Sequence, residues 1–139
     1  MGAPRQVEGY RRASALGHCL GSFPVLELLR HAPGRAQLVV LRSDLAPERR
    51  RPIEDLCREQ NVELRDDDGL LRRVAHRKDV DAFALFEKYR APLDREADHL
   101  VLVEPGNPGN LGTIIRTMVA FGVRDLALTG ASTDHWSPH

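Results

Sequence analysis

Residues 99–130 read HLVLVEPGNPGNLGTIIRTMVAFGVRDLALTG, and this stretch decides the fold of the second part of the chain. It holds two short apolar runs, at 99–103 and 124–129, each of which is typical of a buried strand. A loop rich in Gly and Asn and a segment with helical periodicity lie between them. Strands that are joined through a helix pair in parallel, so the stretch predicts a β-α-β unit.

The helix of this unit is expected over 111–121, with Asn110 as its cap and Gly122 at its end. Apolar residues at spacings of about three and four share one side of this helix; they are Leu111, Ile114, Ile115, Met118 and Gly122. The other side carries Thr113, Arg116, Thr117 and Ala120. Arg116 is therefore expected to project away from the apolar stripe, into solvent or into a site.

The loop before the helix has more than one interpretation on spacing alone. Unpaired backbone N–H groups at a helix start suit a phosphate or a carboxylate. Gly106, Gly109 and Gly112 form a GxxGxxG pattern that is similar to Rossmann-type dinucleotide loops, but the second strand ends in Thr129 and Gly130 without the expected acidic residue. In the purely structural interpretation, the glycines make a turn and Asn110 only caps the helix.

The upstream region, residues 20–90, alternates helical and strand patterns, which predicts a small α/β sandwich. The expected elements are a helix capped by the Ser22 hydroxyl, a strand over 36–41, a helix over 47–60, a strand over 61–64, a short helix capped by Asp68 and a strand over 80–86. A polar linker follows at 91–98. Residues 1–95 carry 18 basic and 15 acidic side chains and residues 96–139 carry 2 and 5, so we expect two domains with these bounds.

Composition excludes several classes of protein. The chain has 20 basic and 20 acidic side chains, so no global field draws it to nucleic acid or to a membrane. No apolar run reaches the roughly 18 residues of a membrane span. Cys19 and Cys57 form no CxxC pair, which argues against zinc and disulfides and fits a cytoplasmic protein. His135 and His139 lack a third ligand, so we expect no metal site.

Two arginine clusters are candidates for an RNA-facing surface, because guanidinium groups bind phosphate with two hydrogen bonds. They are Arg49, Arg50 and Arg51 on the second helix, and Arg72, Arg73 and Arg77 with Lys78 further along. The alternative is an ordinary solvated face whose charge is balanced by neighbouring carboxylates.

The run VLVEPGNPGNLGTIIRTMVAFGVRDLALTG closely resembles motif 1 of the SpoU (TrmH) family within the SPOUT methyltransferases. The core of the resemblance is Asn110-Leu-Gly-Thr-Ile-Ile-Arg116-Thr, followed by Phe121-Gly122-Val123. The upstream region resembles, more weakly, the RNA-binding domain that often precedes this motif. The implied fold is α/β, with a small RNA-binding-like domain followed by the first β-α-β unit of a SPOUT methyltransferase domain.

The resemblance implies an activity and its residues. Family members transfer a methyl group from S-adenosylmethionine to a ribose 2′-hydroxyl of ribosomal or transfer RNA. Asn110 and Arg116 match the catalytic positions of the motif. A guanidinium is too basic to act as a free base, so Arg116 is expected to hold an RNA phosphate and to stabilise the developing 2′-oxyanion. Asn110 is expected to orient Arg116 or the substrate.

The chain also departs from the family pattern. Family members continue into motifs 2 and 3, which fold into a trefoil knot, bind the cofactor and form the homodimer. The sequence ends at His139 before these motifs. We therefore expect a truncated chain that lacks the knot, does not bind S-adenosylmethionine, forms no specific dimer and is inactive alone. The alternatives are a non-catalytic RNA-binding module and a Rossmann-type nucleotide-binding domain.

Overall fold

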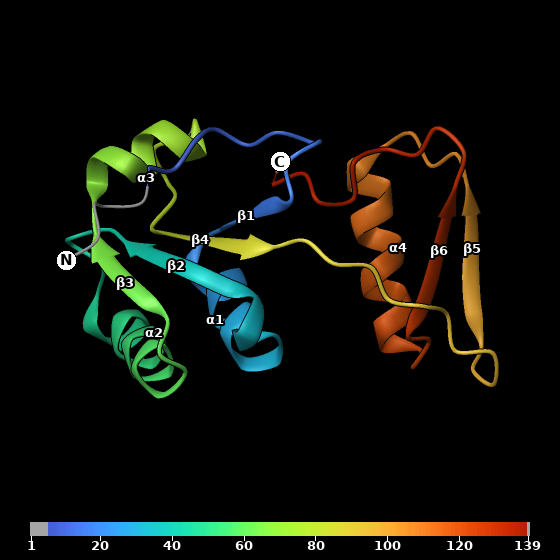
Figure 1. The fold of residues 1–139 in the computed structure, drawn as a ribbon, viewed down its shortest axis with the longest axis horizontal. Coiled ribbons are helices and arrows are strands. Elements are labelled where there is room, and N and C mark those ends of the chain that lie inside the picture. The colour runs from blue at the N-terminus through green and yellow to red at the C-terminus, as the bar shows by residue number, and fades with distance from the viewer. Residues whose placement is uncertain (1–5, 139) are drawn as a thin grey trace. The chain divides into compact units, whose positions relative to one another are not determined.

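A computed structural model of the chain describes residues 6–138 and divides into two compact units between Lys88 and Tyr89 (Figure 1). The first unit contains β1 (Leu16–Leu20), α1 (Ser22–His31), a short 3-10 helix (Pro33–Arg35), β2 (Ala36–Leu41), α2 (Pro47–Glu59), β3 (Glu63–Asp66), α3 (Asp68–Ala75) and β4 (Ala82–Glu87). The second unit contains β5 (His99–Val103), α4 (Pro108–Ala120) and β6 (Asp125–Thr129). The α/β fold expected from the sequence is confirmed.

The first unit is a four-stranded sheet in the order β1-β4-β2-β3, with helices on both faces (Figure 1). Strand β4 is antiparallel to β1 and to β2, whereas β2 and β3 are parallel. Successive side chains of a strand point to opposite faces. Along β2, Val39 and Leu41 accordingly pack with α1 and α2, whereas Leu38 and Val40 pack with α3.

Two of the expected helix caps in this unit are wrong. Gly21, with a φ of 101°, occupies the cap position of α1, and the Ser22 hydroxyl instead donates to Asp81 Oδ2 at 3.1 Å. Asp67 caps α3 by accepting from the Leu70 N–H at 2.8 Å, and the Asp68 carboxylate accepts from Ser43. In both places the competing partner lies far away in sequence, so local spacing did not reveal it.

The strand expected over 61–64 begins later, at Glu63. Asn61 has a φ of 55°, and the Val62 N–H bonds to the Cys57 carbonyl at 2.8 Å, so these two residues complete the end of α2. Strand β1 was not expected at all, because Gly17 and His18 interrupt its apolar pattern. Gly17 packs directly under the Phe86 ring: an added Cβ would lie 2.4 Å from that ring, so a larger residue would have to displace it.

The second unit is the predicted β-α-β arrangement, with β5 and β6 paired in parallel. Helix α4 ends where the sequence indicates: Gly122 has a φ of 74°, and the Val123 N–H bonds to the Met118 carbonyl at 2.9 Å. This is the hydrogen-bond pattern of a glycine-terminated helix, which satisfies carbonyls of the last turn.

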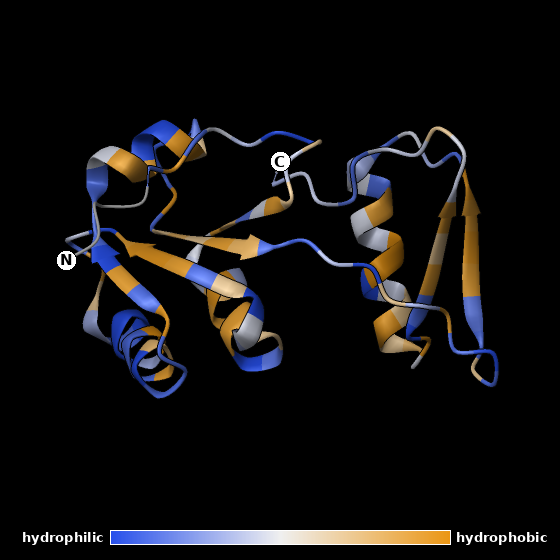
Figure 2. Cartoon of the chain, viewed as in Figure 1, coloured by the Kyte–Doolittle hydropathy of each residue, from blue (hydrophilic) through white to orange (hydrophobic). Residues whose placement is uncertain are grey.

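The apolar stripe of α4 is less buried than its spacing indicates. Leu111 and Met118 are buried, but Ile115 is 38% exposed. The reason is that two strands offer too narrow a surface to cover the whole stripe. Val101 and Val103, on the other face of this small sheet, are also exposed. Figure 2 shows that β5 and β6 are coloured as hydrophobic over most of their length. No helix among residues 6–138 has the length and apolar character needed to cross a membrane.

Candidate functional site

The loops that leave β5 and β6 are fastened together at the carboxyl ends of the two strands. Glu104, which follows β5, has a φ of 50°, and its N–H bonds to the Thr129 carbonyl at 3.0 Å. Its side chain packs so closely on Gly130 that an added Cβ there would lie 2.5 Å from Glu104 Cγ. Carboxyl ends of parallel strands are the usual ligand-binding edge of α/β folds. The strained backbone of Glu104 carried no signal in the sequence.

The start of α4 differs from the expectation in its capping residue. Asn107 is the cap: its side-chain Oδ1 accepts from the Asn110 N–H at 2.9 Å, and its carbonyl accepts from the Leu111 N–H at 3.0 Å. Pro108 has no N–H. Within the described chain, only Gly109 retains a first-turn N–H without a recorded partner. The unpaired backbone N–H groups that the sequence suggested for binding an anion are therefore mostly occupied. Asn110 is an exposed residue of the first helical turn.

The glycines of the loop do not form a dinucleotide-type turn. The glycines with positive φ in the described residues are Gly21, Gly122 and Gly130, so Gly106, Gly109 and Gly112 adopt ordinary backbone conformations. An added Cβ would meet nothing within 4 Å at Gly106 or at Gly112. No close backbone approach therefore explains the GxxGxxG spacing.

Arg116 projects from α4 on the exposed side, as expected. Its Nη2 donates to Thr113 Oγ1 at 3.4 Å, and Thr113 Oγ1 in turn donates to the Gly109 carbonyl at 3.1 Å. In the part of the chain that the structure describes, Arg116 forms no ion pair with a carboxylate. Asn110 lies six positions earlier, about 9 Å along the helix axis, and no recorded hydrogen bond joins it to Arg116. The guanidinium charge is therefore available to an anion.

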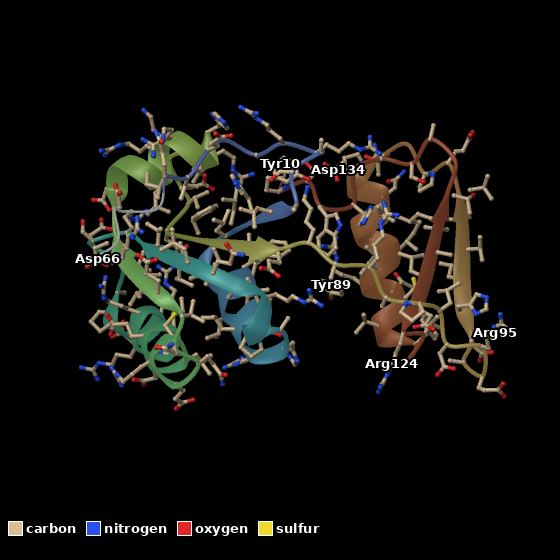
Figure 3. The ribbon with its side chains drawn as sticks, viewed as in Figure 1. Tyr10, Asp66, Tyr89, Arg95, Arg124 and Asp134 are labelled. Carbon is tan, nitrogen blue, oxygen red and sulfur yellow. The ribbon has the colours of Figure 1, made fainter. Side chains whose placement is uncertain are left out.

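The first arginine cluster of the other unit is largely neutralised. Arg49 Nη1 lies 2.8 Å from Asp81 Oδ2. Arg50 lies 2.6 Å from both Glu54 and Asp66, and Asp66 is labelled in Figure 3. The hydrogen bonds that Arg50 donates, first to Asp66 and then to Glu54, raise the pKa of its guanidinium. Arg51 is exposed and forms no ion pair within residues 6–138, so among these described residues it is the one member of the cluster without a carboxylate partner.

The second cluster is more open. Arg72 and Arg73 lie in the last turn of α3, exposed and without a recorded ion pair among the described residues. Arg77 lies 3.5 Å from Asp79, and both side chains are well exposed. Two hydrogen bonds from Ser43 lower the pKa of Asp68, and the nearby charge of Arg72 adds to this effect.

Sequence reasoning missed the buried carboxylate of Asp81, which is 7% exposed. It accepts from the Ser22 N–H at 2.9 Å, from the Ser22 hydroxyl at 3.1 Å and from Arg49 at 2.8 Å. These bonds join the start of α1, the start of α2 and the approach to β4. Because every partner belongs to the fold itself, we assign Asp81 a structural role.

One small groove lies beside α4, with a volume of about 290 Å³. It is lined by Leu100, Thr113, Ile114, Thr117, Met118, Phe121 and Val123. The lining is mostly apolar and includes no carboxylate that could hold a ribose. The groove therefore does not fit S-adenosylmethionine. No cluster of His, Cys, Asp and Glu suited to a metal occurs within residues 6–138, and His139 lies outside the described residues.

The aromatic residues near the end of the chain pack on one another. Tyr89, labelled in Figure 3, and Trp136 have ring centroids 5.3 Å apart, and the His135 ring lies 5.2 Å from Trp136. The Trp136 N–H bonds to Asp134 Oδ1 at 3.1 Å. Trp136 is therefore part of the packing of its own unit.

Comparison with known proteins finds a family whose sequence model matches the second unit and solved structures with a similar fold. Residues 98–139 match the model of the SpoU rRNA Methylase family, and a search of curated protein sequences gave no match. An rRNA methyltransferase from Sinorhizobium meliloti is 22% identical with a TM-score of 0.66, over 88% of this chain and 48% of that chain.

Two further solved structures are similar. The SpoU methyltransferase AviRb from Streptomyces viridochromogenes, in complex with the cofactor AdoMet, is 20% identical with a TM-score of 0.68, over 89% of this chain and 49% of that chain. An RNA 2′-O ribose methyltransferase is 22% identical with a TM-score of 0.63, over 89% and 48%. The chain thus spans about half the length of each structure. Residues 98–139 carry the sequence of the SpoU family, and the chain as a whole is similar in fold to the N-terminal part of these methyltransferases.

Proposed function

We propose that the chain acts in the 2′-O-methylation of a ribose in ribosomal or transfer RNA. The observation that carries the proposal is Arg116, which the family-matching segment presents on an exposed helix side, with no carboxylate of residues 6–138 bound to it. An unpaired guanidinium at this position suits a phosphate or an oxyanion. Arg49 and Arg50, in contrast, already form ion pairs with carboxylates.

The reaction forms a bond between the ribose 2′-oxygen and a methyl carbon, and the proton of the 2′-hydroxyl passes to solvent water. S-adenosylmethionine would supply the methyl group when bound, and its bond between the methyl carbon and sulfur would break. Arg116 holds an adjacent phosphate and stabilises negative charge as it develops on the 2′-oxygen. Asn110 orients the substrate with its side-chain amide, which is available because Asn107 caps the helix.

We assign no residue of the chain to the cofactor, because the groove beside α4 does not fit it. The described residues supply the RNA side of the reaction and do not bind S-adenosylmethionine by themselves. Isothermal titration of the 139-residue chain with S-adenosylmethionine tests this. We expect no saturable heat, and one-to-one saturation in the micromolar range would contradict the assignment.

RNA binding is expected to depend on the cations that the structure leaves unpaired. Arg51, Arg72 and Arg73 meet solvent, whereas Arg49, Arg50 and Arg77 already have carboxylate neighbours. Each unpaired cation that meets a phosphate releases counterions, so affinity falls as salt rises.

Fluorescence anisotropy with a structured fragment of ribosomal RNA measures this binding. Changing Arg51, Arg72 and Arg73 together to Glu should weaken binding and flatten its salt dependence. A matched control reverses three exposed and paired arginines, Arg11, Arg30 and Arg58, whose partners are Glu8, Glu27 and Asp55, and should have a much smaller effect. Equal losses in both variants would show a general charge effect and no defined RNA surface.

The open arginines of the first unit also favour a second candidate, a non-catalytic RNA-binding module. In that case the triple Arg51, Arg72 and Arg73 variant would lose RNA, and Arg116→Ala would bind RNA as well as the unchanged chain. A loss in the Arg116 variant favours the methyltransferase proposal.

A further inference from the structure

We infer that Thr113 is a positioning residue for Arg116: its hydroxyl directs the guanidinium without neutralising it. This inference rests on the proposed function of Arg116 in binding RNA phosphate and the 2′-oxyanion.

The direction of the hydrogen bonds around Thr113 is fixed by its single proton. The hydroxyl donates that proton to the Gly109 carbonyl, at 3.1 Å. A hydroxyl has one proton and two lone pairs, so the remaining lone pairs can only accept. Arg116 Nη2, one helical turn further on, donates to this oxygen at 3.4 Å. The Gly109 carbonyl, Thr113 and Arg116 thus form a chain of hydrogen bonds along one side of α4.

The chemistry of the partner decides what Arg116 can still bind. Arg50 is held by the carboxylates of Glu54 and Asp66, and an RNA phosphate would have to displace them. The Thr113 hydroxyl carries no charge, so Arg116 keeps its full attraction for an anion while its side chain loses rotational freedom. Less side-chain entropy then remains to be lost when the phosphate binds. At 3.4 Å the bond is long, and such contacts shorten when a charged ligand completes the site.

Thr117 provides a matched control on the same helix. It lies one turn beyond Thr113, is also exposed, and its hydroxyl also donates to the backbone, at 3.0 Å from the Thr113 carbonyl. Among the described residues, Arg116 donates to the Thr113 hydroxyl and not to that of Thr117. A substitution of Thr117 therefore repeats any effect on helix propensity or on the small groove, but leaves the contact with Arg116 in place.

The test uses the whole 139-residue chain and two readouts. The first is the ¹⁵N order parameter of Arg116 Nε, which reports its motion on the picosecond to nanosecond scale. The second is affinity for the ribosomal RNA fragment. Thr113→Val should lower the order parameter and weaken RNA binding roughly twofold to tenfold, the range for one net hydrogen bond. Thr113→Ser should retain both values, and so should Thr117→Val.

The double variant separates this inference from the proposed function. In an Arg116→Ala background, Thr113→Val should cause no further loss of RNA affinity. If Arg116→Ala weakens binding but Thr113→Val changes neither readout, the positioning role is wrong and the proposed function stands. If Arg116→Ala leaves RNA affinity unchanged, the proposed function is wrong, and the inference that depends on it is overturned as well.

Discussion

The side chain of Asn107 accepts a hydrogen bond from the backbone N–H of Asn110 at 2.9 Å, which gives two asparagines of one motif different tasks. Asn107 satisfies the start of α4. Asn110 is left exposed on the first helical turn, with its amide available to a substrate. The division leaves the whole side-chain amide of Asn110, oxygen as well as nitrogen, available for contact with RNA.

Asn107→Ala should therefore destabilise α4, whereas Asn110→Ala should not. Loss of an asparagine cap costs about 1 kcal/mol. Native-state amide hydrogen exchange reports local opening of a helix, so amides of α4 should exchange roughly fivefold faster in Asn107→Ala. Asn107→Asp should retain most of the protection. Faster exchange in Asn110→Ala than in Asn107→Ala would reverse the assignment of the cap.

Leu111→Ala should destabilise the second unit more than Ile115→Ala. Leu111 is 3% exposed and Ile115 is 38% exposed, so only the first substitution leaves a cavity. A buried Leu→Ala change costs about 2–5 kcal/mol, and substitutions at exposed positions usually cost much less. Amide hydrogen exchange of α4 measures the stability cost of each substitution, because a destabilised helix is less protected. Equal costs would mean that Ile115 is covered in solution.

The second unit could be predicted from sequence because its signals are local. Alternating apolar runs, helical spacing and Gly122 identify β5, α4 and β6 without any distant partner. The start of the helix was placed too late, at 111 with Asn110 as its cap, and Pro108 explains this error. Proline favours the first position of a helix, so the helix starts there and its cap is Asn107.

The arginine clusters show where local reasoning stops. Nothing in the spacing of Arg49 and Arg50 indicates that Asp81 and Asp66 bind them, because these contacts depend on how the strands and α2 are brought together. A charge pattern predicts candidate cations, whereas the fold decides which of them remain unpaired.

Asp81→Ala should destabilise the first unit, because two groups of Ser22 and one of Arg49 lose their acceptor. A hydrogen bond to a charged group contributes about 1.5–3 kcal/mol, and the bond from the exposed Arg49 contributes less than those from Ser22, so a loss of at least about 2–3 kcal/mol is expected. Arg49→Ala should cost less, since that side chain is 60% exposed. Urea unfolding followed by circular dichroism compares the two. A larger cost for Arg49→Ala would contradict the structural role of Asp81.

Both cysteines should be unreactive in the folded chain. Burial raises the pKa of the Cys19 thiol to about 12 and, together with the charge of Glu54, the pKa of Cys57 to about 11. The thiolate is the reactive form, so an aromatic disulfide reagent at about pH 8 should react slowly until the chain is unfolded. Cys19 is only partly buried, and its rapid reaction in the folded chain would contradict the raised pKa of its thiol.

The same shifts predict a loss of stability at high pH. Below about pH 9, the ordinary thiol pKa in the unfolded chain, both thiols are protonated in the folded and the unfolded chain, and the folded chain has its full stability. Above it the unfolded chain releases protons that the folded chain retains, so stability falls as pH rises toward 11 and 12. The urea midpoint should therefore decline above about pH 9, and less steeply in Cys19→Ala.

The role of Arg116 is tested most directly by methyl transfer in a hybrid enzyme. Residues 98–139 would replace the matching segment of the Sinorhizobium meliloti rRNA methyltransferase, which has been solved with bound AdoMet. Isothermal titration with S-adenosylmethionine confirms that each hybrid is folded and binds cofactor. The readout is transfer of a labelled methyl group to ribosomal RNA, with 2′-O-methylation located by resistance to alkaline cleavage. We predict that Arg116→Ala lowers kcat by about 10²–10³, the range for loss of one oxyanion donor, and leaves cofactor affinity unchanged. A hybrid that binds the cofactor and methylates RNA equally well without Arg116 would contradict the account.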